Sequence, residues 1–197
     1  PLAFVDLDKF DRNIAYVAKT QADTGKRIRV ASKSIRCLEL LKRVFKKGGA
    51  VFQGVLAFTM EEAAFLIDNG LDDIIVAYPS VQPRDVDLFV EKSRCGANLC
   101  LVVDCPEHIR VLSEAGEKAG FTLDLCLDID MSYRPLGRFS HLGVRRSPVH
   151  SVDQALAVAR AARNLPGVHI KAVMGYEAQI ASMNDNYPEN VFKNKLL

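Results

Sequence analysis

Residues 29–44, RVASKSIRCLELLKRV, contain the passage from one strand to one helix and set the pattern for the rest of the chain. The run RVAS, with Ile28 before it, has the short apolar character of a buried strand. After Lys33 and Ser34, the leucines and Val44 recur at the spacing of an amphipathic helix. This stretch predicts a β/α unit with a lysine at the carboxyl end of its strand.

The same alternation of short apolar runs and amphipathic stretches recurs with a period of about 25 to 40 residues. Such alternation predicts parallel strands joined by helical crossovers. The expected strands are residues 2–7, 28–32, 51–57, 73–77, 98–104, 123–129 and 168–175.

The inner strands indicate which kind of parallel sheet to expect. Residues 99–103, LCLVV, are continuously apolar, which suits a strand covered on both faces. A barrel and an open doubly wound sheet both remain compatible with this pattern. No GxGxxG follows any predicted strand, so the dinucleotide-binding fingerprint is missing. A closed barrel of eight units takes about 250 residues, so a barrel made by these 197 residues would be incomplete.

Two helix starts have the residue pair of a capping box, in which the first side chain and the residue three positions later satisfy each other's free amides. These pairs are Thr59 with Glu62 and Ser151 with Gln154.

Composition and charge narrow the function classes. The 26 basic and 24 acidic residues are interspersed and give a net charge of +2, which predicts no broad positive surface for nucleic acid or an anionic membrane. The five cysteines form no CxxC pair and match no common zinc spacing, so we expect reduced core thiols. No signal peptide or long apolar run is present, which predicts a cytoplasmic protein.

Lys33 is the polar residue that stands out at a predicted strand end. In parallel β/α architectures the active site lies at the carboxyl ends of the strands. A lysine there can be partly shielded from water, which makes its amine a nucleophile for a carbonyl. The alternative is a surface lysine with a solvated head group, and the residues alone leave both possibilities open.

Four stretches together resemble the alanine racemase superfamily of pyridoxal phosphate enzymes. They are PLAFVDLDKFDRN (residues 1–13), RVASKSIRCLELLKRV (29–44), HLGVRRSPV (141–149) and VMGYEAQIA (173–181). The Lys-Ser pair with a following cysteine is closer to the D-threonine aldolase and D-serine dehydratase branch. The resemblance implies a parallel (β/α)8 TIM barrel of the alanine racemase N-terminal type over residues 1–197. This barrel would be incomplete, with the C-terminal β-domain absent and residues 1–8 a strand of that domain.

The resemblance also implies the site residues. Lys33 would be the catalytic lysine that holds pyridoxal phosphate as a Schiff base. His141, where the family commonly has an arginine, would contact the cofactor ring. Tyr176 and Gln179 would be cofactor neighbours, although the branch often reads Tyr-x-Gly-His here. Gln179 can donate a hydrogen bond but holds no proton to transfer at neutral pH.

Further polar residues are candidates for the site. Arg145 or Arg146 could hold a substrate carboxylate or a phosphate through two hydrogen bonds, or the two could form a solvated pair. Asp128 and Asp130 are two apart on one strand and so share a face, where they could bind metal, transfer protons or orient the nearby Arg134 or Arg138. Residues 130–150 read as a long functional or mobile loop, and residues 184–197 as a damaged edge of the domain.

The resemblance implies a pyridoxal phosphate-dependent lyase, of the aldolase or dehydratase type, that acts at the α-carbon of a D-amino acid. An amino acid racemase and a non-catalytic pyridoxal phosphate homeostasis protein are alternatives, as is a cofactor-free Schiff-base aldolase. We expect a small amino acid substrate and a homodimer. A divalent metal would belong to the missing C-terminal domain.

Overall fold

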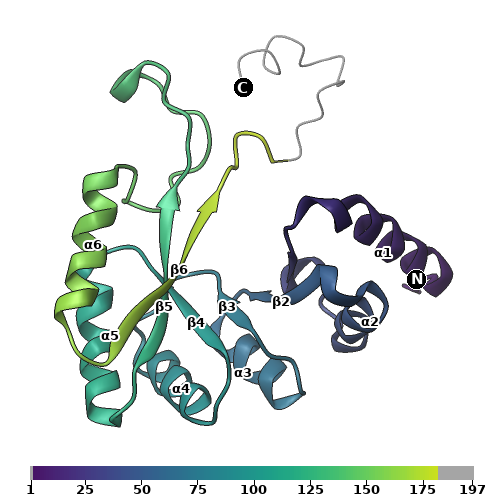
Figure 1. The fold of residues 1–197 in the computed structure, drawn as a ribbon, viewed down its shortest axis with the longest axis horizontal. Helices are drawn as coiled ribbons and strands as arrows, with labels where there is room; N and C mark the ends of the chain where they lie inside the picture. Colours follow the sequence, from purple (N-terminus) through teal and green to yellow (C-terminus); the bar gives the residue numbers. More distant parts are fainter. Residues whose placement is uncertain (1, 182–197) are drawn as a thin grey trace. The chain divides into compact units, whose positions relative to one another are not determined.

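A computed structural model describes residues 2–181, in which helices and strands alternate along the chain (Figure 1). The helices are α1 (Leu7–Gln21), α2 (Leu38–Gly48), α3 (Met60–Asp68), α4 (Pro83–Arg94), α5 (Pro106–Ala119) and α6 (Val152–Asn164). The strands are β1 (Ile28–Ala31), β2 (Phe52–Ala57), β3 (Ile74–Val76), β4 (Leu99–Val103), β5 (Leu123–Asp130) and β6 (Val168–Tyr176). Short 3-10 turns are η1 (Ala22–Thr24), η2 (Ser32–Ser34), η3 (Gly49–Val51) and η4 (Gly137–Phe139).

The six strands follow one another in the order β1-β2-β3-β4-β5-β6. β1 pairs with β2, β2 with β3, β3 with β4 and β5 with β6, and each of these pairs is parallel. The predicted parallel α/β class is therefore confirmed. Six strands are fewer than the eight that close a TIM barrel, so the described sheet is an incomplete one, as expected.

The chain forms two compact units, Pro1–Leu101 and Val102–Leu197. In the first unit α1 packs on α2 and α3 on α4, and in the second unit α5 packs on α6 (Figure 1). All five residues of β4 are buried, which agrees with the continuous apolar pattern of a doubly covered strand. The larger core side chains include Met60 and Phe89 in the first unit and Leu112 and Leu125 in the second.

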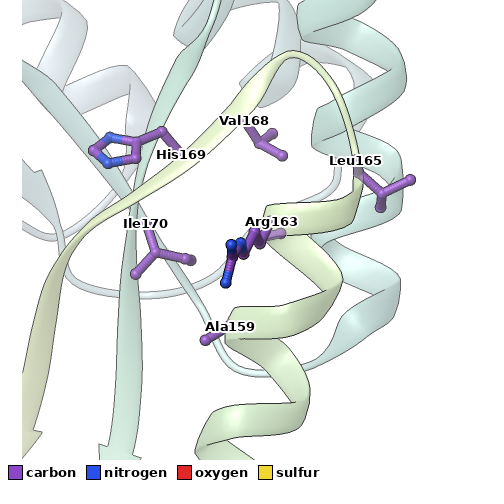
Figure 2. A pocket seen from close by; sticks show the side chains of 7 residues that line it. Ala159, Arg163, Leu165, Val168, His169 and Ile170 are labelled. Atoms are coloured by element: carbon purple, nitrogen blue, oxygen red, sulfur yellow. The ribbon is translucent and has the colours of Figure 1, made fainter.

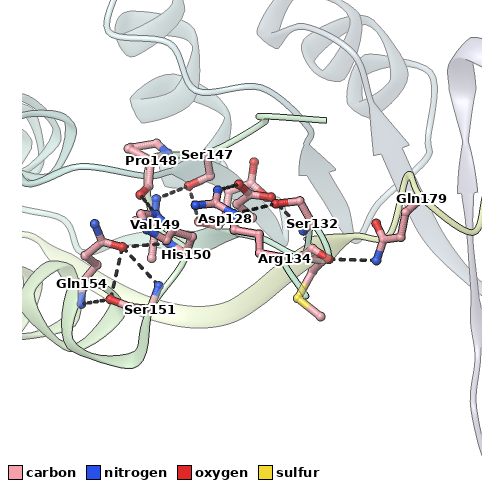
Figure 3. Close-up of polar contacts among 12 residues, drawn as sticks. Asp128, Ser132, Arg134, Ser147, Pro148, Val149, His150, Ser151, Gln154 and Gln179 are labelled. Atoms are coloured by element: carbon pink, nitrogen blue, oxygen red, sulfur yellow. Dashed lines mark hydrogen bonds and ion pairs between the residues drawn. The ribbon is translucent and has the colours of Figure 1, made fainter. Parts of the chain in front are cut away.

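The two predicted capping boxes differ. At the start of α6 the Ser151 and Gln154 side chains cap each other's backbone amides, so this box is confirmed (Figure 3). At the start of α3 the Thr59 hydroxyl accepts from the Glu62 amide at 3.2 Å. The Glu62 carboxylate instead accepts from the amide of Phe58, at 2.7 Å. Only half of the predicted box is therefore present.

The strand predicted over residues 2–7 is wrong for the described structure. Residues 2–6 carry no strand, and Leu7 begins α1. Asp6 caps this helix by accepting from the amide of Lys9 at 3.1 Å, and Asp8 adds negative charge in the first turn. Both features favour a helix start. The assignment of residues 1–8 to a separate β-domain stays a prediction, and the predicted domain edge at residues 184–197 lies outside the described residues.

None of the helices in residues 2–181 has the length and apolar character needed to cross a membrane.

Candidate functional site

Lys33 lies in η2, directly after β1, which is the strand-end position that the sequence predicted. The turn is closed by a hydrogen bond from the amide of Ile35 to the carbonyl of Ser32, at 2.9 Å. Lys33 itself is exposed. The shielding expected for its amine is therefore not supplied by the described residues of the first unit.

Ser32 fixes the residue next to Lys33. Its side chain is buried, with 1% exposed, and its hydroxyl lies 2.9 Å from Glu62 Oε2 and 3.2 Å from the carbonyl of Leu56. A hydroxyl has one hydrogen, so it donates to one of these acceptors at a time. The same Glu62 oxygen accepts from the amide of Phe58. Glu62 thus joins the carboxyl end of β1 to the residue that follows β2.

In the second unit, Asp128 and Asp130 stand at the carboxyl end of β5, and both are buried. Asp128 Oδ2 accepts from Arg146 Nε at 2.9 Å. Asp130 Oδ2 accepts from Arg134 Nη2 at 2.8 Å, and its Oδ1 accepts from the amide of Ser132 at 2.8 Å (Figure 3). Of the roles left open for this pair, orienting arginines is the one that these contacts support.

The two carboxylates have opposite tendencies to ionise. Burial raises the pKa of Asp128, although the adjacent Arg146 acts against this shift. Burial also opposes the ionisation of Asp130, but the bonds from Ser132 and Arg134 outweigh it and hold the pKa of Asp130 below its ordinary value. Asp128 Oδ1 is buried and has no hydrogen-bond partner among the described residues. Asp128 is therefore the carboxyl of the pair that can hold a proton more readily.

The predicted loop over residues 130–150 is tied to the end of β5. Tyr133 and Leu142 form an antiparallel bridge within it. The Ser147 hydroxyl donates to the carbonyl of Asp128 at 2.8 Å, and the amide of Asp130 donates to the carbonyl of Val149 at 2.7 Å (Figure 3). The segment that carries Arg146 is thereby held beside the strand that carries its acidic partner.

Tyr176 ends β6, and its ring centroid lies 5.9 Å from the Arg146 guanidinium carbon. That separation is within the range of a cation–π interaction. Gln179 Nε2 donates to the carbonyl of Met131 at 2.8 Å (Figure 3). The structure thus brings Arg146 and Tyr176 together with Asp128, and holds Gln179 on the residue that follows β5.

The remaining candidates have less defined surroundings. His141 is half-buried, and its Nε2 is buried without a hydrogen-bond partner in the described part of the chain. Arg145 is exposed, in contrast to its neighbour Arg146. Lys33 belongs to the first unit and the other candidates to the second, so its expected proximity to His141 and Tyr176 stays a prediction.

Sequence reasoning missed two features of these sites. It treated Glu62 only as a capping residue, although the same carboxylate supports the turn that carries Lys33. It also overlooked Asp104, Cys105 and His108 as a group, although they stand together where β4 ends. Their spacing within five residues of a predicted strand end was the available signal.

A depression of about 400 Å³ lies away from the strand ends just described. Figure 2 shows it between the last turns of α6 and the start of β6, lined by Ala159, Ala162, Arg163, Leu165, Val168, His169 and Ile170. This is the amino end of β6, whereas chemistry in parallel β/α folds is located at carboxyl ends. We therefore assign this depression no part in the candidate site.

Comparison with known proteins places these features in a family. The family model described as alanine racemase, N-terminal domain, matches residues 5–194. The 3-hydroxy-D-aspartate aldolase of Paracoccus denitrificans is 26% identical over 184 residues, which cover 93% of this chain and 44% of that protein. The D-threo-3-hydroxyaspartate dehydratase of a Delftia species is 26% identical over 181 residues, which cover 90% of this chain and 44% of that protein.

Among solved structures, D-threonine aldolase from Filomicrobium marinum has the same fold, with a TM-score of 0.72 and 24% identity. The similarity covers 86% of this chain and 42% of that one. This chain therefore spans less than half the length of the relatives that it matches.

Proposed function

Because the chain belongs to the alanine racemase N-terminal domain family, we propose that it is the pyridoxal phosphate-binding part of a lyase that acts at the α-carbon of a β-hydroxy-D-amino acid. The observation that carries this proposal is the position of Lys33, in a short turn directly after the first parallel strand. The names of the relatives support the substrate class, since one is an aldolase and another a dehydratase of 3-hydroxyaspartate.

The chemistry of the described residues fits such a cofactor. Lys33 offers an exposed amine for its aldehyde. In the second unit, the buried polar atoms that lack hydrogen-bond partners among the described residues include Asp128 Oδ1, His141 Nε2 and Gln179 Oε1. Unpaired buried polar atoms are costly, and a ligand with a ring nitrogen, a hydroxyl and a phosphate would satisfy such groups. The Tyr176 ring offers an aromatic neighbour.

The cofactor, when bound, supplies a conjugated ring that takes up the electrons released at the α-carbon. The residues of this chain position the reactants and move protons. The Lys33 amine would hold the cofactor through its aldehyde and, when free, would take or return a proton at Nζ. Asp128 orients Arg146 through Nε, and Arg145 is exposed and open to a substrate carboxylate.

The bond that breaks decides between the two lyase activities. Cleavage between the α- and β-carbons of a β-hydroxy amino acid gives glycine and an aldehyde. Loss of the α-proton followed by loss of the β-hydroxyl as water leaves an enamine, which water hydrolyses to a keto acid and ammonia. Both reactions start from the same β-hydroxy substrate, so we propose the substrate class for this chain and let product analysis choose between them. A divalent metal, a homodimer and a cytoplasmic location stay predictions.

A labelling experiment tests the proposal. The purified protein is loaded with pyridoxal phosphate, reduced with borohydride and digested, and the modified lysine is located by peptide mass. We expect the label on Lys33, its loss in Lys33→Ala and its retention in Lys46→Ala, which removes an exposed lysine of α2. Label elsewhere, or none, would contradict the proposal.

Product analysis with D-threonine, D-3-hydroxyaspartate, D-serine and D-alanine then separates the activities. Glycine with an aldehyde, or ammonia with a keto acid, supports the lyase. Formation of the other enantiomer alone would instead support a racemase. Label on Lys33 without turnover of any substrate would support a carrier protein and contradict the lyase.

A further inference from the structure

Three side chains that follow β4 bring an oxygen, a sulfur and a nitrogen donor together. Asp104, Cys105 and His108 stand where β4 ends and α5 begins, and their potential ligand atoms all lie within 4.8 Å of one another. Each is half-buried. The cysteine spacing predicted reduced thiols, and the family resemblance implied that a metal would belong to the missing C-terminal domain, whereas this mixed set arises from the geometry of a helix start.

The local backbone explains why these residues meet. Cys105 is the N-cap of α5, with extended φ and ψ of −150° and 159°, and its side chain makes no capping hydrogen bond. His108 is three residues further on, and side chains at these two helix positions face each other, as in a capping box. Asp104 precedes the cap. The whole set lies within five residues of the second unit, so one strand end and one helix turn are enough to form it.

His108 Nδ1 is the unusual atom of the group. It is buried and lies 3.0 Å from Asp104 Oδ1, yet it has no hydrogen bond of acceptable geometry among the described residues. Two atoms that both carry lone pairs come this close when a proton or a cation lies between them. A protonated imidazole would form an ion pair with the carboxylate at this distance, and a metal ion coordinated by both atoms would take the place of that proton.

The thiol of Cys105 supplies the third donor. Its sulfur is one of the three potential ligand atoms that lie within 4.8 Å of one another. A coordinating metal deprotonates a thiol outright, because its charge stabilises the thiolate. The positive end of the α5 dipole opposes a cation, but this effect is small beside the two full negative charges of the carboxylate and the thiolate.

We propose that Asp104, Cys105 and His108 bind a zinc-type transition-metal ion, with three protein ligands and one open coordination position. Zinc accepts nitrogen, oxygen and sulfur ligands at about 2.0 to 2.3 Å, and catalytic zinc sites commonly keep three protein ligands and one exchangeable position. Calcium and magnesium take oxygen ligands, so a thiolate and an imidazole select against them.

Cobalt(II) substitution tests this site directly, because a thiolate bound to cobalt gives an intense charge-transfer absorption in the near ultraviolet. The full chain is freed of metal with a chelator and titrated with cobalt(II) and zinc(II), without pyridoxal phosphate. We expect the charge-transfer band to saturate at one equivalent and to disappear when zinc is added. The inference does not depend on the proposed function, and the cofactor-labelling result is a separate readout.

Three variants locate the metal. Cys105→Ser should lose the band and yet keep α5, since serine is a good N-cap. His108→Gln should weaken binding by more than about 100-fold, because loss of an outer-shell partner alone costs about 10- to 100-fold. Cys37→Ser is the matched control, since Cys37 is the exposed N-cap of α2 and also makes no capping hydrogen bond. It should bind cobalt as the wild type does.

Several outcomes would overturn the site. These are the absence of a charge-transfer band in the wild type, a band that persists in Cys105→Ser, or a band that disappears in Cys37→Ser. X-ray absorption spectroscopy of the zinc-loaded wild type identifies the atoms around the metal, so it tests the site even if a variant fails to fold. One sulfur with nitrogen or oxygen neighbours supports the proposal, and a zinc environment without sulfur rejects it.

Discussion

The hydroxyl of Ser32 lies 2.9 Å from Oε2 of Glu62, which joins the residue before Lys33 to the first turn of α3. Ser32 is almost completely buried, and the same carboxylate oxygen accepts a hydrogen bond from the amide of Phe58. One carboxylate of the first unit therefore supports the ends of two neighbouring strands. The turn that carries Lys33 depends on this carboxylate for its position.

Glu62→Ala should destabilise the fold, because it removes an acceptor from the buried Ser32 hydroxyl and from the Phe58 amide. The Ser32 hydroxyl keeps the carbonyl of Leu56 as an acceptor, so the cost is that of lost hydrogen bonds to a carboxylate, about 1.5–3 kcal/mol, measurable as a fall in the free energy of unfolding in urea. Glu61→Ala is the control, since Glu61 is exposed and pairs with an exposed arginine, and it should stay within about 0.5 kcal/mol of wild type. Equal effects of the two variants would refute the role of Glu62.

Arg146→Met should destabilise the second unit, because it leaves the Asp128 carboxylate buried without its cation. Breaking such a pair costs about 3 kcal/mol or more. Burial already raises the pKa of Asp128, and loss of Arg146 raises it further. Protonation then relieves the penalty, so the deficit should shrink as pH falls from 7. Arg145→Met, at the exposed neighbouring position, should unfold like the wild type, and a deficit independent of pH would contradict the assignment.

Asp11→Asn should reduce the loss in the free energy of unfolding as the pH falls into the acid range. Hydrogen bonds from Arg43, with a contribution from Lys47, lower the pKa of Asp11 to about 2 against burial. A depressed pKa in the folded state contributes stability above the ordinary pKa of 3.8, and this contribution is lost as pH falls towards 2. The variant should therefore lose less stability than wild type over that interval. Asp87→Asn, at an exposed position of α4, should follow the wild-type curve.

Gly116→Ala should be destabilising although it lies inside a helix. A side chain at Gly116 would meet the carbonyl of Gly167, where α5 approaches the turn before β6. Overpacking of this kind costs about 1–3 kcal/mol, whereas the same change at an open helix position stabilises by up to about 1 kcal/mol. The midpoint of thermal unfolding is the measurement, and we expect it to fall. A higher midpoint would show that the contact between Gly116 and the carbonyl of Gly167 can relax to admit a methyl group.

The sequence was sufficient for the described strands because each is a short apolar run closed by polar or turn residues. All six strands after the first agree with the predicted bounds to one residue at each end. The strand prediction for residues 2–7 was wrong because an apolar run can also occur before a helix, and the capping role of Asp6 was not recognised. Local patterns therefore predicted the elements wherever local interactions determine them.

The candidate site was less accessible from sequence because its contacts join distant residues. Ser32 and Glu62 are 30 residues apart, and Asp128 and Arg146 are 18 apart. The alternation of residues along a strand could place Asp128 and Asp130 on one face, and the nearby Arg134 was correctly predicted as a partner of the pair. Local spacing could not show that Asp128 would meet the more distant Arg146. Lys33 was identifiable because strand-end chemistry and the family resemblance converge on it.

Because β1 is short, its coding sequence should tolerate substitutions better than insertions or deletions. The strand has four residues, Ile28–Ala31, and successive side chains in a strand alternate between faces. Loss or gain of one codon between Arg29 and Ser32 would turn the serine hydroxyl away from α3 and rotate the following lysine with it. Substitutions can accumulate in this stretch, whereas insertions and deletions there would separate the lysine from its support.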